Sequence, residues 1–234
     1  MLQPILTLPS GTELKGGSPG SAVKSLTLHT AVNAGQEFTI GSAFSDYIEA
    51  EIWADPDGSL QITAGDALTY YRQDDAGSRT KVGVFYAEKP TRTKRNSYKV
   101  TAYDTMSKLD ADFSGWLHAN QAQFPKTIWQ LVQLACQRAG VTLASSSLPI
   151  NGSYSVQAFY ADDLTCRQII SWAAEAAGCY AHMNADGKLQ FLTYTDKRST
   201  AKITPDGASN NTAYYADSLS YEDYTVKAIE KVQI

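Results

Sequence analysis

Cysteine is scarce in this chain of 234 residues: Cys136, Cys166 and Cys179 are all that occur. An odd count without a C-x-x-C pair supports neither a disulfide framework nor a zinc knuckle. Free cysteine behaves as a small apolar residue, so we expect all three thiols to be buried and structural.

Long apolar runs and a strong charge of one sign are also missing. No run reaches the roughly 18 apolar residues of a membrane-spanning helix, so we expect no membrane insertion. The N-terminal residues lack the basic start and apolar segment of a secretory signal, which predicts synthesis in the cytoplasm. The net charge is −4 and the pI is near 5.4. This balance argues against a dedicated nucleic-acid binder, which is usually basic.

Recognisable catalytic and metal-binding motifs are absent as well. The sequence has no G-x-S-x-G elbow. The stretch from Asp55 begins like a calcium loop, but Leu60 stands where that loop needs glycine and Asp66 where it needs glutamate. The histidines lie outside zinc-binding patterns such as H-E-x-x-H: His29, His118 and His182. We therefore predict no catalytic residues, no metal ligands and no cofactor.

Paired acidic residues leave carboxylate catalysis open as an alternative. The pairs are Glu49/Glu51, Asp74/Asp75, Asp162/Asp163 and Glu222/Asp223. A glycosidase needs two carboxylates across a cleft, one of them with a raised pKa. Glu49 and Glu51 would project from the same face of a strand, so a solvated face is the default interpretation.

One stretch concentrates positive charge: Lys89, Arg92, Lys94, Arg95 and Lys99. It is either a solvated hairpin loop or an electrostatic patch that faces a polyanion or an acidic neighbour. Aromatic residues are not interleaved through it, so sequence-specific binding of single strands is not expected.

The first part of the chain alternates with a period of two. In the segment 48–53, Ile48, Ala50 and Ile52 alternate with Glu49, Glu51 and Trp53. Such alternation predicts strands with one buried and one wet face. Turns recur about every 8–12 residues, which indicates a barrel or sandwich. We predict an N-terminal β-barrel-like domain over residues 1–110.

Two later segments predict amphipathic helices that resemble each other. Thr127 and Thr165 each begin a Thr-x-x-Gln capping box, and they are 38 positions apart. Each segment ends near a glycine suited to a left-handed residue, Gly140 and Gly178. Either a structural repeat or coincidence between two well-capped helices explains the match.

The remaining pattern predicts a second α+β domain over residues 111–234. It contains the helices near 127–139 and 165–177 and a hairpin near 180–194 that turns at Asp186-Gly187. Residues 221–234 read as a strand to the last residue, which indicates a longer parent protein or a partner that completes the sheet. The predicted fold class is α+β, mostly β, with two barrel-like β domains and two short amphipathic helices.

An ordered set of segments resembles a known family. The set is FTIGSA (38–43), VFY (84–86), YKVTAYDTM (98–106), FPKTI (124–128), AGV (139–141), LTCRQII (164–170) and ADGKL (185–189). In this order the segments are similar to the N-terminal region of phage tail-tip and baseplate-hub proteins. These are the tail-associated proteins similar to the T4 baseplate hub, which are common in prophages of Gram-positive bacteria.

The resemblance implies a non-enzymatic structural part of the virion tail tip. In that family three copies form a ring that closes the tail tube, carries the distal tail parts and opens for DNA passage. The resemblance implies that the chain forms a homotrimer. It also implies contacts with neighbouring tail-tube, distal tail and tape-measure proteins. Two other classes stay open. One is a carboxylate-dependent cell-wall hydrolase, testable at Glu49 and Asp163, and the other is a carbohydrate- or receptor-binding module that uses the tyrosines and tryptophans.

Overall fold

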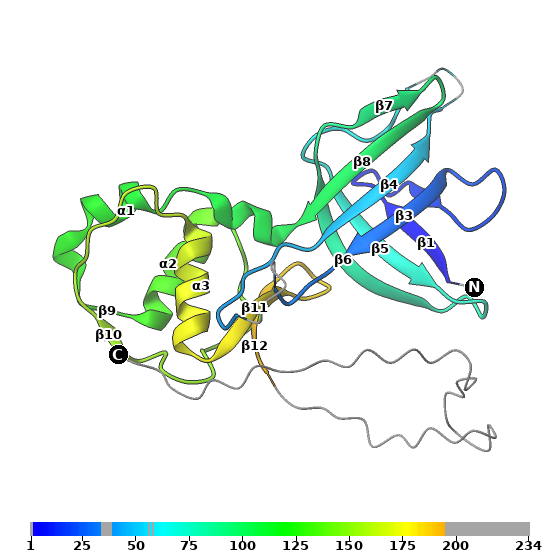
Figure 1. Cartoon of the computed structure of the whole chain (residues 1–234). Helices are drawn as coiled ribbons and strands as arrows, with labels where there is room; N and C mark the ends of the chain where they lie inside the picture. The colour runs from blue at the N-terminus through cyan, green and yellow to red at the C-terminus, as the bar shows by residue number, and fades with distance from the viewer. Residues whose placement is uncertain (1, 34–38, 56, 58, 195–234) are drawn as a thin grey trace, which may run out of the picture. The chain divides into compact units, whose positions relative to one another are not determined.

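Eight strands form one antiparallel sheet in the computed structural model, which describes residues 2–33, 39–55, 57 and 59–194. The strand order is β2-β1-β5-β6-β8-β4-β3, and β7 pairs with the free part of β8 (Figure 1). The strands are β1 (Gln3–Thr7), β2 (Glu13–Lys15), β3 (Val23–His29), β4 (Tyr47–Trp53), β5 (Ala67–Gln73), β6 (Arg79–Ala87), β7 (Thr91–Lys94) and β8 (Ser97–Asp104).

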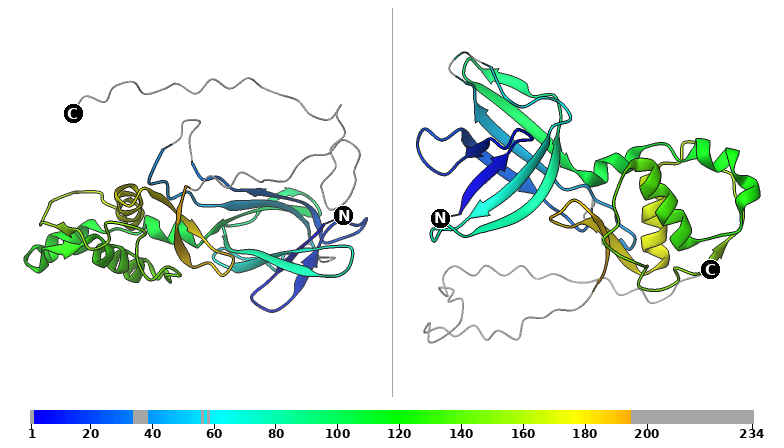
Figure 2. Two further views of the ribbon diagram at one scale, coloured as in Figure 1. Left: turned by 90° about the horizontal axis from the view of Figure 1, so that it is seen from below. Right: turned by 180° about the vertical axis from the view of Figure 1, so that it is seen from behind.

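The sheet curves so that one face encloses an apolar core. On β4, Ile48, Ala50 and Ile52 are buried while Glu49 and Glu51 lie on the outer face, as the alternation predicts. The curvature brings β1 near β3 (Figure 2). Among the described strands the ladder ends at β2 and β3, so no closed barrel forms.

Short helices and two small strand pairs follow the sheet. The helices are η1 (Thr105–Asp110), α1 (Ser114–Ala119), η2 (Gln121–Gln123), α2 (Ile128–Ala139) and α3 (Cys166–Ala176). The strands β9 (Lys126–Thr127) and β10 (Ser155–Val156) form one antiparallel pair, and β11 (Cys179–Met183) and β12 (Leu189–Thr193) form the other. Helices α2 and α3 pack side by side (Figure 1).

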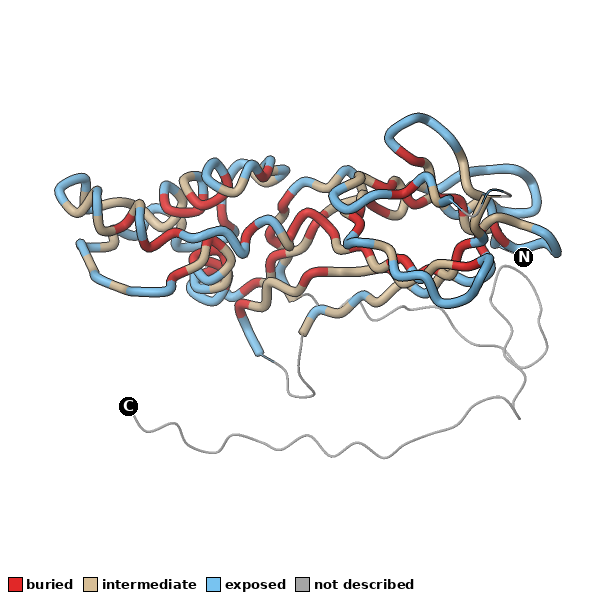
Figure 3. The backbone as a smooth tube through the Cα atoms, turned by 90° about the horizontal axis from the view of Figure 1, so that it is seen from above, coloured by how far each residue is buried: buried red, intermediate tan, exposed pale blue. Residues whose placement is uncertain are grey.

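These elements confirm the α+β, mostly β class but show no second barrel among the described residues after 110. The buried residues there come at helical spacing, and the strands are too short and too few to close. Apolar side chains form one cluster inside the sheet, from Leu6 to Ala102, and another around the helices, from Met106 to Phe191. Figure 3 shows buried residues in both parts of the chain. The division at residue 110 stays a prediction. The expected strand 221–234 and the Glu222/Asp223 pair lie outside the described residues.

Both predicted capping boxes are present. Gln130 donates its backbone N–H to the Thr127 hydroxyl at 3.2 Å and accepts from the Thr127 N–H at 2.8 Å. Thr165 and Gln168 repeat this arrangement with the same two distances. The caps satisfy N–H groups that would otherwise lack partners at each helix start.

The two helices also bury the same positions. Shifting by 38 residues pairs the buried residues Leu131/Ile169, Val132/Ile170, Ala135/Ala173 and Cys136/Ala174. Both helices contact η1 as well as each other. Gly140 and Gly178 have φ values of 65° and 60°, the left-handed region expected after each helix. The likeness therefore extends from the caps to the buried faces.

Candidate functional site

A row of aromatic side chains crosses the outer face of the sheet where it meets the helices. His29, Tyr47, Tyr103 and Tyr86 lie directly opposite one another on β3, β4, β8 and β6. The His29 and Tyr47 rings stack with centroids 4.3 Å apart, and Tyr103 follows at 5.4 Å. Lys108 of η1 places its ammonium 3.8 Å from the centre of the Tyr86 ring. Such cross-strand neighbours stabilise the sheet and present a continuous aromatic surface.

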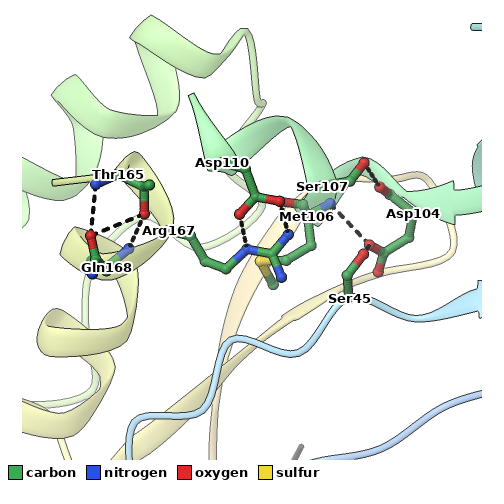
Figure 4. A network of polar contacts seen from close by, with 8 residues as sticks. All are labelled: Ser45, Asp104, Met106, Ser107, Asp110, Thr165, Arg167 and Gln168. Atoms are coloured by element: carbon green, nitrogen blue, oxygen red, sulfur yellow. Dashed lines mark hydrogen bonds and ion pairs between the residues drawn. The ribbon is translucent and has the colours of Figure 1, made fainter. Parts of the chain in front are cut away.

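A buried carboxyl lies beneath this row, at the end of β8. Asp104 is 4% exposed and accepts hydrogen bonds from the Ser45 hydroxyl at 2.7 Å and the Met106 N–H at 3.0 Å (Figure 4). It thereby caps η1 and fixes the segment before β4. Burial raises the pKa of Asp104 to about 6, and the negative charge of Asp46 adds to the rise, against the opposing effect of the Ser45 hydrogen bond.

The neighbouring Asp46 connects this segment to β11. The Nε2 atom of His182 lies 3.2 Å from an Asp46 carboxylate oxygen. This hydrogen bond raises the pKa of His182, although partial burial opposes the rise. Two backbone hydrogen bonds also connect the segment before β4 to β11. The Gly41 N–H donates to the Cys179 carbonyl, and the Ala181 N–H donates to the Ser42 carbonyl.

Arg167 joins α3 to η1. Its Nε and Nη2 atoms each lie 2.7 Å from an Asp110 carboxylate oxygen, and Nη2 also donates to the Met106 carbonyl at 3.2 Å (Figure 4). The planar guanidinium suits such a two-pronged contact. The Arg167–Asp110 pair therefore holds the start of α3 against η1.

A pocket of about 510 Å³ opens between these groups. Its lining combines aromatic rings, hydroxyls and charged groups: Phe44, Ser45, Tyr47, Glu88, Tyr103, Ser107, Asp110 and Arg167. Glu88 is exposed, and its carboxylate forms no ion pair with another described residue. Since Arg167 neutralises Asp110, Glu88 leaves the lining with a net negative charge. We call this feature the junction pocket.

A second, apolar depression lies between α2 and α3, with a volume of about 190 Å³. It is lined by Ile128, Leu131, Val156, Phe159, Ile169, Trp172 and Ala173. Trp172 is 48% exposed, and its ring packs edge-on against Phe159. Tyr154, just before β10, and Tyr160, between β10 and α3, are also exposed. Exposed apolar surface of this kind is typical of contact sites.

The two neighbouring carboxylates on β4, Glu49 and Glu51, each form an ion pair with a lysine. Glu49 pairs with Lys99 and Glu51 with Lys24, and these hydrogen bonds hold the pKa of both carboxyl groups below their usual range. A general acid needs the opposite shift. Asp163 lies on another element, the exposed loop before α3, with a φ of 54°.

Most of the basic concentration lies on the hairpin that β7 and β8 form, and Lys89 precedes β7. Arg92, Lys94 and Arg95 are exposed, and none forms an ion pair with another described residue. The Arg92 guanidinium lies over the Tyr98 ring and donates to the Arg95 carbonyl. Lys99 instead pairs with Glu49, so the uncompensated charge lies near the turn.

The three cysteines are buried, as expected. Burial raises the pKa of Cys136 to about 12 and that of Cys179 to about 11.

His118 stacks on Tyr160 with ring centres 4.0 Å apart. In the described part of the chain, no group of three or more His, Cys, Asp or Glu residues is placed to hold a metal ion. No helix within those residues is long and apolar enough to cross a membrane.

Sequence reasoning missed the aromatic row and the junction pocket. Their residues come from segments far apart in the chain, and the strand register that aligns them is not encoded locally. Tyrosines at alternating positions indicate an aromatic face on the strands, but they do not indicate which tyrosines lie opposite one another.

Comparison with known proteins finds likeness in structure alone. No family model matches the sequence, and no curated protein matches it. One similar solved structure is the 43 kDa tail protein of prophage MuSo2 from Shewanella oneidensis, with 13% identity, a TM-score of 0.57 and 87% of this chain covered. Another is the tail protein from Neisseria meningitidis MC58, with 12% identity, a TM-score of 0.52 and 81% covered.

This chain shares the fold of these two tail proteins. It spans 59% of the length of the Shewanella protein and 50% of that of the Neisseria protein. At such low identity the likeness concerns the fold, and side-chain sites do not transfer with it.

Proposed function

We propose that the chain is a structural component of a phage or prophage tail. The observation that carries the proposal is the likeness of its fold to two tail proteins over most of its described length. The finer proposal follows the sequence resemblance: a homotrimeric ring at the tail tip or baseplate hub, which closes the tube and carries distal parts.

Surface features of the described residues support an assembly role. The sheet ends at β2 and β3, and unpaired strand edges are sites where other chains add. The depression between α2 and α3 exposes Trp172, a residue type that is frequent in protein interfaces. The partners proposed for these surfaces are tail-tube, distal tail and tape-measure proteins.

Immunogold labelling tests the proposal. Particles are induced from cells that encode the chain and are labelled with an antibody against it. The expected result is label at the distal end of the tail, with matched label absent from particles of a deletion strain. Label on the capsid, or recovery of the chain only outside particles, would contradict a tail role.

A receptor- or carbohydrate-binding module is the second candidate. Exposed Tyr154, Tyr160 and Trp172 supply rings on which a sugar could stack. A glycan array with Trp172→Ala as the comparison would support this candidate if binding depended on that ring. The proposed role includes no catalysis, and a turnover assay on cell-wall material with Glu49→Gln and Asp163→Asn checks this part.

A further inference from the structure

The junction pocket has the chemistry to bind a cationic side chain. Phe44, Tyr47 and Tyr103 supply aromatic rings, whose faces attract ammonium and guanidinium groups. Glu88 adds a carboxylate that pairs with no other described residue. Rings with one unbalanced carboxylate at the rim favour an arginine or lysine.

The β7–β8 hairpin presents such cations. Arg92, Lys94 and Arg95 are exposed and lack ion pairs with described residues. The chain thus carries a basic hairpin and, on another part of its surface, a pocket whose lining has a net negative charge. Complementary patches of this kind steer association and fix its orientation.

The hairpin of one chain cannot fill its own pocket. Ser97 begins β8 beside the basic turn, while Tyr103, near the other end of β8, lines the pocket. At about 3.3 Å per residue these ends are roughly 20 Å apart along a rigid strand. Figure 1 shows β7 at the end of β8 that is remote from η1 and the helices.

We propose that the β7–β8 hairpin of one copy docks into the junction pocket of a second copy. Because the two patches are different surfaces of one chain, the contact is head-to-tail, and repetition closes a ring or extends a filament. The contact gives a physical basis for the proposed tail ring, and ring closure rests on that proposed function.

Sedimentation velocity of the full chain tests the contact. The wild-type chain is expected to self-associate as its concentration rises, and less strongly in high salt, which screens exposed charges. Glu88→Lys in the pocket, or Arg92→Glu with Arg95→Glu in the hairpin, is expected to weaken association at least about tenfold, as for charge pairs at interfaces. Lys188→Glu, an exposed reversal in the β11–β12 turn, is the matched control and is expected to behave as wild type.

Mixing the two kinds of variant gives the sharpest result. The Glu88→Lys chain keeps an intact hairpin, and the Arg92→Glu/Arg95→Glu chain keeps an intact pocket. The altered pocket and the altered hairpin also carry opposite charges, so the two variants are expected to associate with each other, through heterodimers, although neither self-associates strongly alone. Circular dichroism and melting curves verify that every variant is folded.

Several outcomes would overturn the contact. These are a wild-type chain that stays monomeric throughout, variants that associate like wild type, or a mixture that forms no heterodimer. Loss of double-stranded DNA binding in the hairpin variant, with self-association unchanged, would assign the hairpin to a polyanion instead. A tail ring that persists in Glu88→Lys particles would reject this contact and leave the proposed function standing. Association as described, in a chain missing from tails, would reject the function alone.

Discussion

Asp104 is a buried carboxyl that favours its protonated form. Its pKa in the folded chain is about 6, against an ordinary value of 3.8. A raised carboxyl pKa means that its favourable contribution to stability is complete below about pH 4 and is lost as pH rises through 6. His182, whose pKa is also raised, acts in the same direction: the stabilisation from its pair with Asp46 is present below about pH 6.5 and lost above its folded pKa. The folded chain therefore loses stability at Asp104 and at the His182–Asp46 pair as the pH rises from mildly acidic to neutral.

Asp104→Asn should remove the part of the pH dependence of stability that lies between about pH 4 and pH 6. The amide keeps an oxygen for the Met106 N–H and Ser45 hydroxyl but carries no charge. At neutral pH the free energy of unfolding should rise by on the order of 3 kcal/mol, because the pKa of Asp104 rises from 3.8 to about 6 and each pKa unit corresponds to about 1.4 kcal/mol. Urea unfolding between pH 4 and 8 measures it. Asp66→Asn, in an exposed turn, is the control, and an unchanged pH profile in Asp104→Asn would refute the explanation.

The cysteine thiols should be inert in the folded chain. All three are buried, and burial raises their pKa values, so little reactive thiolate is accessible. A thiol-specific reagent at mildly alkaline pH should therefore modify them only at the rate of unfolding. Modification of any one at the rate of a free cysteine would show that it is accessible.

At the scale of the elements, local chemistry fixes what the sequence could predict. The capping boxes at Thr127 and Thr165 and the turn at Asp186-Gly187 depend on residues only a few positions apart, and the structure has all of them. Gly187 has a φ of 71°, and its close approach to the Thr105 side chain leaves no room for a Cβ atom. The prediction of a second barrel was wrong for the described residues because the strands after residue 110 pair only two by two, and no local pattern specifies which strands pair.

The two capping boxes should be worth similar amounts. Thr127→Ala and Thr165→Ala each remove one cap acceptor, so each should lower the free energy of unfolding by about 1 kcal/mol. Thr127→Ser and Thr165→Ser keep the hydroxyl and should retain most of the stability, while Gln133→Ala on the exposed face of α2 serves as a neutral control. Chemical denaturation measures all five. A loss in the serine variants equal to that in the alanine variants would show that the caps do not account for it.

At the scale of the molecule, contacts between distant segments create the surfaces. The pocket requires Phe44, Tyr103 and Arg167 to converge from the segment before β4, from β8 and from α3. No local pattern specifies that convergence, because it depends on strand register and on how η1 directs the chain away from β8. The basic hairpin, in contrast, was visible as a charge concentration, although its complement on the same chain was not.

Cryo-electron microscopy of purified tails that contain this chain tests the structural role most directly. A ring at the tail tip predicts density for three copies around the tail axis at its distal end, each with the curved sheet and the α2–α3 pair in place. Tails without density for the chain, or with a single copy off the axis, would contradict it.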